Sequence, residues 1–228
     1  MMAAHSTKRL PRIVGVIASS ADLNRVTRLR NLPDLFELRL DCLAGTADQV
    51  EKLLPSLRRP LVITARDPHE GGANDLGLRQ RRDLVRRFLV HADYIDVELR
   101  SARALRALLA NAKTKKIRRI ISFHDFKSTP SPRILAAKAC QARAHGADIF
   151  KVATRTDTPL EVGRLLEFMT SSRFNLSLAV MGIGRLGAIS RVLLARAGSV
   201  LLYASIGSAT EVEGQMSLAE VRGLGLGP

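Results

Sequence analysis

Short apolar segments recur along the whole chain, and segments with helical periodicity separate them. Eight runs rich in β-branched residues begin near residues 12, 35, 61, 94, 119, 148, 176 and 200. Between them, apolar positions three and four residues apart predict helices, most clearly over residues 47–57, 78–92, 101–112, 131–146 and 160–172. Buried strands that alternate with amphipathic helices are typical of a parallel sheet.

The number of these units predicts the architecture. Eight strand and helix units in 228 residues, slightly under the usual size of about 250, indicate an α/β protein with a closed (β/α)8 TIM barrel. No composition shift or Pro/Gly-rich linker divides the chain. We therefore expect a single domain over residues 1–228, with a flexible tail at 1–11 and a last loop at 207–217 that leads to a closing helix.

An open, doubly wound sheet is the alternative architecture. Such a sheet usually carries a glycine-rich turn after its first strand, where it binds a nucleotide. The segment IASSADLNR has no glycine there, and the glycines of MGIGRLGAISR come late in the chain without an acidic residue placed for a ribose. The barrel is the better interpretation.

Polar residues within the strand segments keep to one face. Alternate residues of a strand share a face, and one parity collects Glu37, Arg39 and Asp41 in one segment, Asp96 and Glu98 in another, and Ser122 and His124 in a third. The opposite parity is apolar, which suits packing under the helices. We therefore expect the polar sets to point into the barrel, where active sites lie at the C-terminal ends of the strands.

A lysine stands in the middle of the sixth strand segment, DIFKVAT. Burial of an unpaired ammonium is costly, so Lys151 must either point outward or have a task inside the barrel. A desolvated lysine is the usual nucleophile for a ketone or an aldehyde, and the iminium that it forms acidifies the neighbouring carbon. The position therefore indicates Schiff-base chemistry, which needs a base nearby.

His124 is the best candidate for that base. It is the only one of the five histidines inside a strand segment, and its ordinary pKa suits both accepting and returning a proton near neutrality. Glu70 follows the third strand and could orient the imidazole ring. His69, in a loop, is a weaker candidate.

Three arginines fall at or just beyond strand ends: Arg39, Arg66 and Arg191. Guanidinium groups bind carboxylates through paired hydrogen bonds, so this set predicts an anionic substrate that bears a carboxylate. No cluster of His, Cys, Asp or Glu has metal-ligand spacing, and Cys42 and Cys140 suggest neither a zinc site nor a disulfide framework.

The charge of the chain raises the question of nucleic acid. The net charge is +15, from 36 Lys and Arg against 21 Asp and Glu, but the basic residues are spread along the chain and no nucleic-acid motif is present. We interpret the charge as a solvated, arginine-rich surface and expect no nucleic-acid partner.

No apolar run is long enough to span a membrane, and the N-terminal segment lacks a signal-peptide core, so we expect a cytoplasmic protein.

The ordered motifs resemble a known family. FELRLD, TARDPHEGG, ISFHDF, ADIFKVAT, MGIGRLGAISR and EGQMSLAEV are similar, in order and spacing, to the motifs of type I 3-dehydroquinate dehydratase. The resemblance implies a (β/α)8 barrel, usually a homodimer, that converts 3-dehydroquinate to 3-dehydroshikimate in the shikimate pathway without a metal or an added cofactor.

The resemblance also implies roles for individual residues. Lys151 resembles the Schiff-base lysine. His124 matches the general base that takes the C2 proton and then donates to the leaving hydroxyl, and Glu70 matches the carboxylate paired with it.

The substrate-binding set follows from the same motifs. Glu37, Arg39 and Arg66 resemble the residues that position the hydroxyls and charges of the substrate. Arg191 resembles the arginine that binds the substrate carboxylate, and Gln215 the glutamine of the loop that covers the ring.

Two positions depart from the family pattern. Glu211, in EVEGQ, replaces a Ser or Thr of the last loop, and Tyr203 stands where Phe is common.

Two other functions stay open from the residues alone. One is another lysine-imine barrel of the aldolase or transaldolase kind; the other is a catalytically silent barrel that binds a partner through its basic surface.

Overall fold

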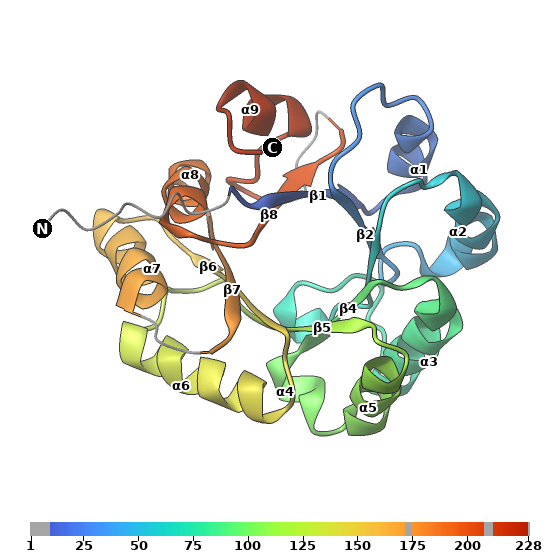
Figure 1. Ribbon diagram of the computed structural model, residues 1–228, viewed down its shortest axis with the longest axis horizontal. Helices are drawn as coiled ribbons and strands as arrows, with labels where there is room; N and C mark the ends of the chain where they lie inside the picture. Colours follow the sequence, from blue (N-terminus) through green and yellow to red (C-terminus); the bar gives the residue numbers. More distant parts are fainter. Residues whose placement is uncertain (1–9, 172–174, 208–211, 228) are drawn as a thin grey trace, which may run out of the picture.

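A single eight-stranded sheet forms the centre of the molecule. The computed structural model describes residues 10–171, 175–207 and 212–227. The strands are β1 (Arg12–Ile17), β2 (Leu35–Arg39), β3 (Leu61–Thr64), β4 (Tyr94–Glu98), β5 (Arg118–Asp125), β6 (Ile149–Arg155), β7 (Ser177–Ile183) and β8 (Leu201–Ser205). All the pairings are parallel, in the order β7-β6-β5-β4-β3-β2-β1-β8. Figure 1 shows the strands curled into a barrel inside a ring of helices.

The barrel is nearly closed between β7 and β8. Within the described residues these two strands share no ladder, but the backbone N–H of Val200 donates to the carbonyl of Leu178 at 2.9 Å. The hydroxyl of Ser199 accepts from the N–H of Val180 at 3.0 Å. These bonds hold the two edges together, and the (β/α)8 architecture predicted from the sequence is confirmed.

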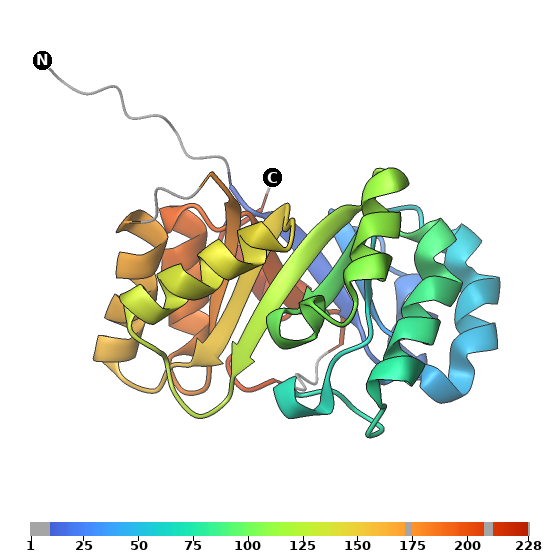
Figure 2. The ribbon, with the colours of Figure 1, turned by 90° about the horizontal axis from the view of Figure 1, so that it is seen from below.

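Helices cover the outside of the sheet. They are α1 (Ser20–Val26), α2 (Ala47–Leu53), α3 (Leu78–Phe88), α4 (Leu99–Ala102), α5 (Arg106–Thr114), α6 (Pro132–Ala144), α7 (Pro159–Ser171), α8 (Gly187–Ala197) and α9 (Leu218–Gly223). The side view in Figure 2 shows β5, β6 and β7 running in the same direction toward the loops at one end. No helix of the described residues is long and apolar enough to cross a membrane.

Three predicted helices differ from the observed ones. The helix expected over 78–92 ends at Phe88 and continues as a 3-10 turn, Leu89–His91. The helix expected over 47–57 ends at Leu53 and continues as a 3-10 turn, Leu54–Ser56, because Pro55 has no N–H to continue the α-helical bonding. The helix expected over 101–112 is divided between α4 and α5, which a short turn separates.

The parity of the strand residues is as predicted. Phe36, Leu38, Ile95 and Val97 belong to the apolar layer between the sheet and the helices. A second apolar cluster fills the inside of the barrel and includes Val14, Leu35, Val62, Tyr94, Ile120, Ile149, Leu201 and Tyr203. The polar inward-facing residues of β2 to β6 lie closer to the C-terminal ends of the strands than this cluster, and they form the floor of the site.

Candidate active site

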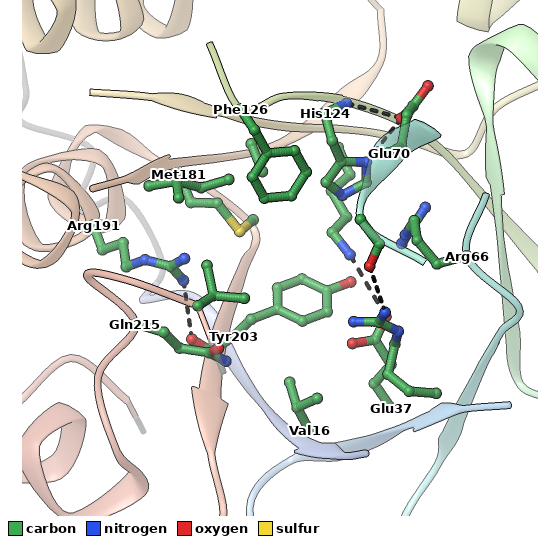
Figure 3. Close-up of a pocket in the computed structure, with 16 residues that line it drawn as sticks. Val16, Glu37, Arg66, Glu70, His124, Phe126, Met181, Arg191, Tyr203 and Gln215 are labelled. Carbon is green, nitrogen blue, oxygen red and sulfur yellow. Dashed lines mark hydrogen bonds and ion pairs between the residues drawn. The ribbon is translucent and has the colours of Figure 1, made fainter. Parts of the chain in front are cut away.

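A cavity opens where the strands end, at the C-terminal end of the barrel. Its volume is about 560 Å³, including space open to solvent. All eight residues that the sequence assigned to the site line it: Glu37, Arg39, Arg66, Glu70, His124, Lys151, Arg191 and Gln215. Figure 3 shows most of them converging from different strands and loops. Within the described residues, no group of three His, Cys, Asp or Glu side chains could hold a metal ion.

Lys151 points into the barrel from the middle of β6. The residue is 4% exposed, and its Nζ donates to Oδ2 of Asp96 at 2.9 Å. Oε1 of Glu37 lies 3.6 Å from the same nitrogen. On another side, Nζ lies 4.0 Å from the centre of the Tyr203 ring. The lysine is therefore buried but paired, and its amine lies at the floor of the cavity.

A chain of alternating charges continues from Asp96 toward the helix layer. Arg66 donates to both carboxylate oxygens of Asp96, at 3.2 and 2.8 Å, and to Oε1 of Glu98 at 2.9 Å. Arg81, on α3, donates to Oε2 of Glu98 at 2.9 Å and to Asp67 at 2.6 Å. Each buried charge in this chain thus has a partner of opposite sign, as burial requires.

The chain of charges fixes the protonation state of Asp96. Burial alone would raise the pKa of its carboxyl group, but the charges of Arg66 and Lys151 outweigh burial and hold that pKa well below its usual value. Arg66 has its own pKa raised well above the usual value, because Asp96 and Glu98 outweigh the effect of burial. Both groups are therefore ionised at neutral pH.

His124 and Glu70 form a second pair. His124 lies two residues beyond Ser122 on β5, and Ser122 is in register with Lys151, so the imidazole stands one side-chain layer closer to the mouth than the amine. Glu70 belongs to a short turn, Pro68–Glu70, after β3. Its Oε2 lies 3.0 Å from Nδ1 of His124 and accepts the backbone N–H of the same residue at 2.9 Å.

The environment shifts the pKa of both groups toward the neutral form. Burial, with the Arg66 and Lys151 charges, holds the pKa of His124 well below its usual value. Burial, followed by the nearby charge of Glu98, raises the pKa of Glu70 to about 7. When Glu70 is ionised, it accepts a hydrogen bond from Nδ1–H of His124. Nε2 is then the basic nitrogen of the neutral imidazole ring.

The three predicted arginines have different surroundings. Arg66 is engaged by Asp96 and Glu98, and Arg39 donates to both oxygens of Asp41 at 3.0 and 2.7 Å. Arg191, from α8, is 3% exposed and has no acidic partner among the described residues. It donates to the backbone carbonyls of Gly182 at 3.2 Å and Tyr203 at 3.1 Å.

The isolation of Arg191 has an electrostatic consequence. Burial lowers the pKa of its guanidinium to about 10, with no acidic group to offset it. The group nevertheless stays charged at neutral pH, so a buried positive charge faces the cavity without a negative partner. An anionic ligand would supply that partner.

The loop after β8 brings Gln215 to the rim. Ser205 pairs with Ser217 in a parallel bridge, and the N–H of Gln215 donates to the carbonyl of Val212 at 3.0 Å. Val212 and Gln215 both line the cavity. Part of the loop predicted at 207–217, including Glu211, lies outside the described residues.

Comparison with known proteins assigns the chain to a family. A family model described as type I 3-dehydroquinase matches residues 14–224. The chain belongs to the type I 3-dehydroquinase family. The resemblance inferred from the ordered motifs is confirmed.

Individual relatives agree with this assignment. The 3-dehydroquinate dehydratase of Shouchella clausii is 34% identical over 205 residues, which cover 83% of this chain and 79% of the relative. The type I 3-dehydroquinate dehydratase of Clostridium difficile, solved with covalently modified comenic acid, superposes with a TM-score of 0.84 at 25% identity and covers 96% of this chain and 92% of its own. The Geobacillus kaustophilus enzyme has a TM-score of 0.83 at 27% identity, with 94% and 89% covered.

Sequence reasoning missed part of the site of this type I 3-dehydroquinase. Asp96 was predicted to face inward, but its contact with Lys151 was not. Arg81 was interpreted as one of many surface arginines, although it shares the buried stripe of α3 with Val85 and Phe88. That spacing of four and three residues was the signal available in the sequence. Tyr203 was noted only as a departure.

Replacing Arg81 tests the chain of charges. We expect Arg81→Met to lower the free energy of unfolding by about 3–5 kcal/mol, because it leaves Asp67 and Glu98 buried with fewer positive partners. The measurement is equilibrium unfolding in denaturant. Arg82→Met, on the same helix with an exposed partner, is the matched control and should cost about 1 kcal/mol or less. Equal stabilities of the two variants would contradict this account.

Proposed function

We propose that this chain dehydrates 3-dehydroquinate to 3-dehydroshikimate through a Schiff base on Lys151. One observation supports the assignment of residues: in a family of 3-dehydroquinate dehydratases, a lysine of the cavity lining lies buried beneath a histidine and carboxylate pair. The relatives named above carry the dehydratase activity in their names.

The proposed sequence of steps uses the two layers of the site. Lys151 attacks the ketone carbon of the substrate, and loss of water gives an iminium ion. The iminium withdraws electrons from the neighbouring C2 carbon, whose proton then passes to Nε2 of His124. The electrons left on C2 form the new double bond as the hydroxyl group leaves, and His124 returns its proton to that hydroxyl. Hydrolysis of the iminium releases the product and the amine.

The electrostatic arrangement supports these roles. Ionised Glu70 stabilises the imidazolium that forms when His124 takes the proton. Asp96 is held by Arg66 as well as by the lysine, so it remains paired after Lys151 becomes bonded to the substrate. In this scheme the chain of charges keeps the amine in place before and after the covalent step.

The substrate-binding roles follow from the charged and polar groups that line the cavity. Arg191 binds the substrate carboxylate, because it is the buried cation without an acidic partner in the described part of the chain. Glu37 and Arg39 position hydroxyl groups. Arg66 acts through Asp96, and Gln215 covers the ring from the loop after β8.

The alternative functions have less support. An aldolase or transaldolase barrel would share the lysine, but the relatives are named as dehydratases over most of the chain. A catalytically silent barrel would not need all eight assigned residues around one cavity. For the whole protein we propose a homodimer, as the family resemblance implies. We also propose a cytoplasmic location and no nucleic-acid partner, from the sequence arguments given above.

Lys151→Met tests the proposed function. The change keeps most of the length of the side chain but removes the nucleophile, so we expect the rate of dehydration to fall on the order of 10⁴-fold or more. The assay follows the ultraviolet absorbance of the conjugated product. Lys113→Met, at an exposed position of α5, is the control and should keep the wild-type rate. Retained turnover by the Lys151 variant would overturn the proposed mechanism.

The pH dependence tests the role of Glu70. Because its pKa is raised to about 7, its carboxylate is the minor form below that pH and the major form above it. Only the carboxylate supports His124 as a base, so kcat/KM should rise with pH through about 7. Glu70→Gln should lose this rise and be slower by roughly 10²-fold. A variant that keeps the wild-type profile would show that the inflection belongs to another group.

Arg191→Met tests carboxylate recognition. Loss of a buried partner for the substrate anion should raise KM about 30-fold or more, since breaking such a pair costs about 2–5 kcal/mol. Steady-state kinetics with 3-dehydroquinate give the value. Arg196→Met, near the exposed end of the same helix, serves as the control. An unchanged KM for the Arg191 variant would assign the carboxylate to another residue.

A further inference from the structure

Tyr203 has an uncommitted hydroxyl inside the active site. The residue is 3% exposed, and its phenol oxygen has no hydrogen-bond partner among the described residues. A buried hydroxyl without a partner costs free energy. The side chain lines the cavity, and Figure 3 shows its hydroxyl directed toward the side where Glu37 and Arg66 lie. The geometry thus points to a ligand that completes the bond.

The acidic and hydroxyl groups that the structure describes around Lys151, other than Tyr203, are acceptors or already donate to a carboxylate. Its two acidic neighbours, Asp96 and Glu37, are acceptors. The hydroxyls of Ser122 and Thr64 already donate to these carboxylates, at 2.6 and 2.8 Å.

The hydrogen bonds of Arg66 run to side chains beside or behind the amine. Its Nη1 and Nη2 atoms are engaged by Asp96, Glu98 and Ser122. Among the hydroxyl groups next to the amine in the described structure, only that of Tyr203 has a proton to offer.

Addition of the amine to a ketone creates a need for such a donor. As the bond between nitrogen and carbon forms, the electrons of the C=O bond move onto oxygen, and carboxylates would repel the developing negative charge. A positioned hydrogen-bond donor at this oxygen stabilises the transition state.

We propose that Tyr203 is a further catalytic residue, whose phenol donates a hydrogen bond to the oxygen that Lys151 displaces during iminium formation. The inference rests on the proposed Schiff-base function. The overall step is balanced without an external reagent: the Lys151 ammonium and the ketone give an iminium ion and water, with two ammonium protons leaving on the oxygen. The phenol keeps its own proton.

Two further features of Tyr203 agree with this role. Burial and the charges of Glu37 and Asp96 hold the pKa of the phenol well above its usual value, so it remains a donor throughout the working pH range. The ring face lies 4.0 Å from Nζ of Lys151, and the Tyr203 carbonyl accepts from Arg191 at 3.1 Å. The tyrosine is thus held between the nucleophile and the arginine proposed to bind the carboxylate.

Tyr203→Phe removes only the hydroxyl and tests the proposal. Rapid mixing with 3-dehydroquinate, followed by quenching with borohydride, measures the rate of iminium formation. We expect this rate to fall about 10²-fold. The melting temperature should not fall, because the lost hydroxyl has no hydrogen-bond partner among the residues that the structure describes.

A substrate deuterated at C2 allows the kinetic isotope effect on turnover to be measured. A purely structural role of Tyr203 would leave this isotope effect unchanged. If iminium formation becomes limiting in the variant, the kinetic isotope effect on turnover should approach one. Tyr94→Phe is the matched control, because its hydroxyl accepts from Arg12 and Arg118 at the other end of the barrel interior. It should form the iminium at the wild-type rate.

The outcomes separate this proposal from the proposed function. Wild-type rates of iminium formation in Tyr203→Phe would overturn the role of the tyrosine and leave the dehydratase mechanism intact. Failure of the wild-type protein to form any iminium would overturn the Schiff-base mechanism, and the tyrosine proposal with it. A slowed rate in Tyr203→Phe alone, with a suppressed isotope effect, would support the proposal.

Discussion

The pairing of buried charges inside the barrel is the constraint on which the site depends. A lysine near the centre of a strand would be costly if it were alone. Here Lys151 contacts Asp96, which Arg66 also holds, and the alternation continues through Glu98 to Arg81 in the helix layer. This arrangement keeps an amine at the floor of a cavity without leaving an uncompensated charge beneath it.

Arg191 is the complement of that chain. Its guanidinium is as deeply buried as that of Arg66, but backbone carbonyls are its hydrogen-bond acceptors. Cations with carboxylate partners hold the site together, whereas Arg191, which has no such partner in the described part of the chain, is suited to recognising an anion. The same distinction applies to hydroxyls: those of Ser122 and Thr64 donate to carboxylates, whereas that of Tyr203 has no partner among the described residues.

Much of this could be predicted from the sequence, because strand parity is a local property. The inward direction of Glu37, Asp96 and His124 followed from alternation with apolar neighbours, and the eight strands lie close to the predicted segments. The pairing of particular charges could not be predicted in the same way. Arg66, just after β3, contacts Glu98 at the end of β4, 32 residues away. Arg81 contacts the same carboxylate from α3, whose other arginines are not buried. The side chain at Glu211 falls outside the described residues.

The central claim is that Lys151 forms a covalent Schiff base. The most direct measurement is to incubate the protein with 3-dehydroquinate and borohydride and to map the reduced adduct by intact and peptide mass spectrometry. The account predicts a single adduct on the peptide that contains Lys151. No adduct from a folded protein, or an adduct on a different lysine, would contradict it.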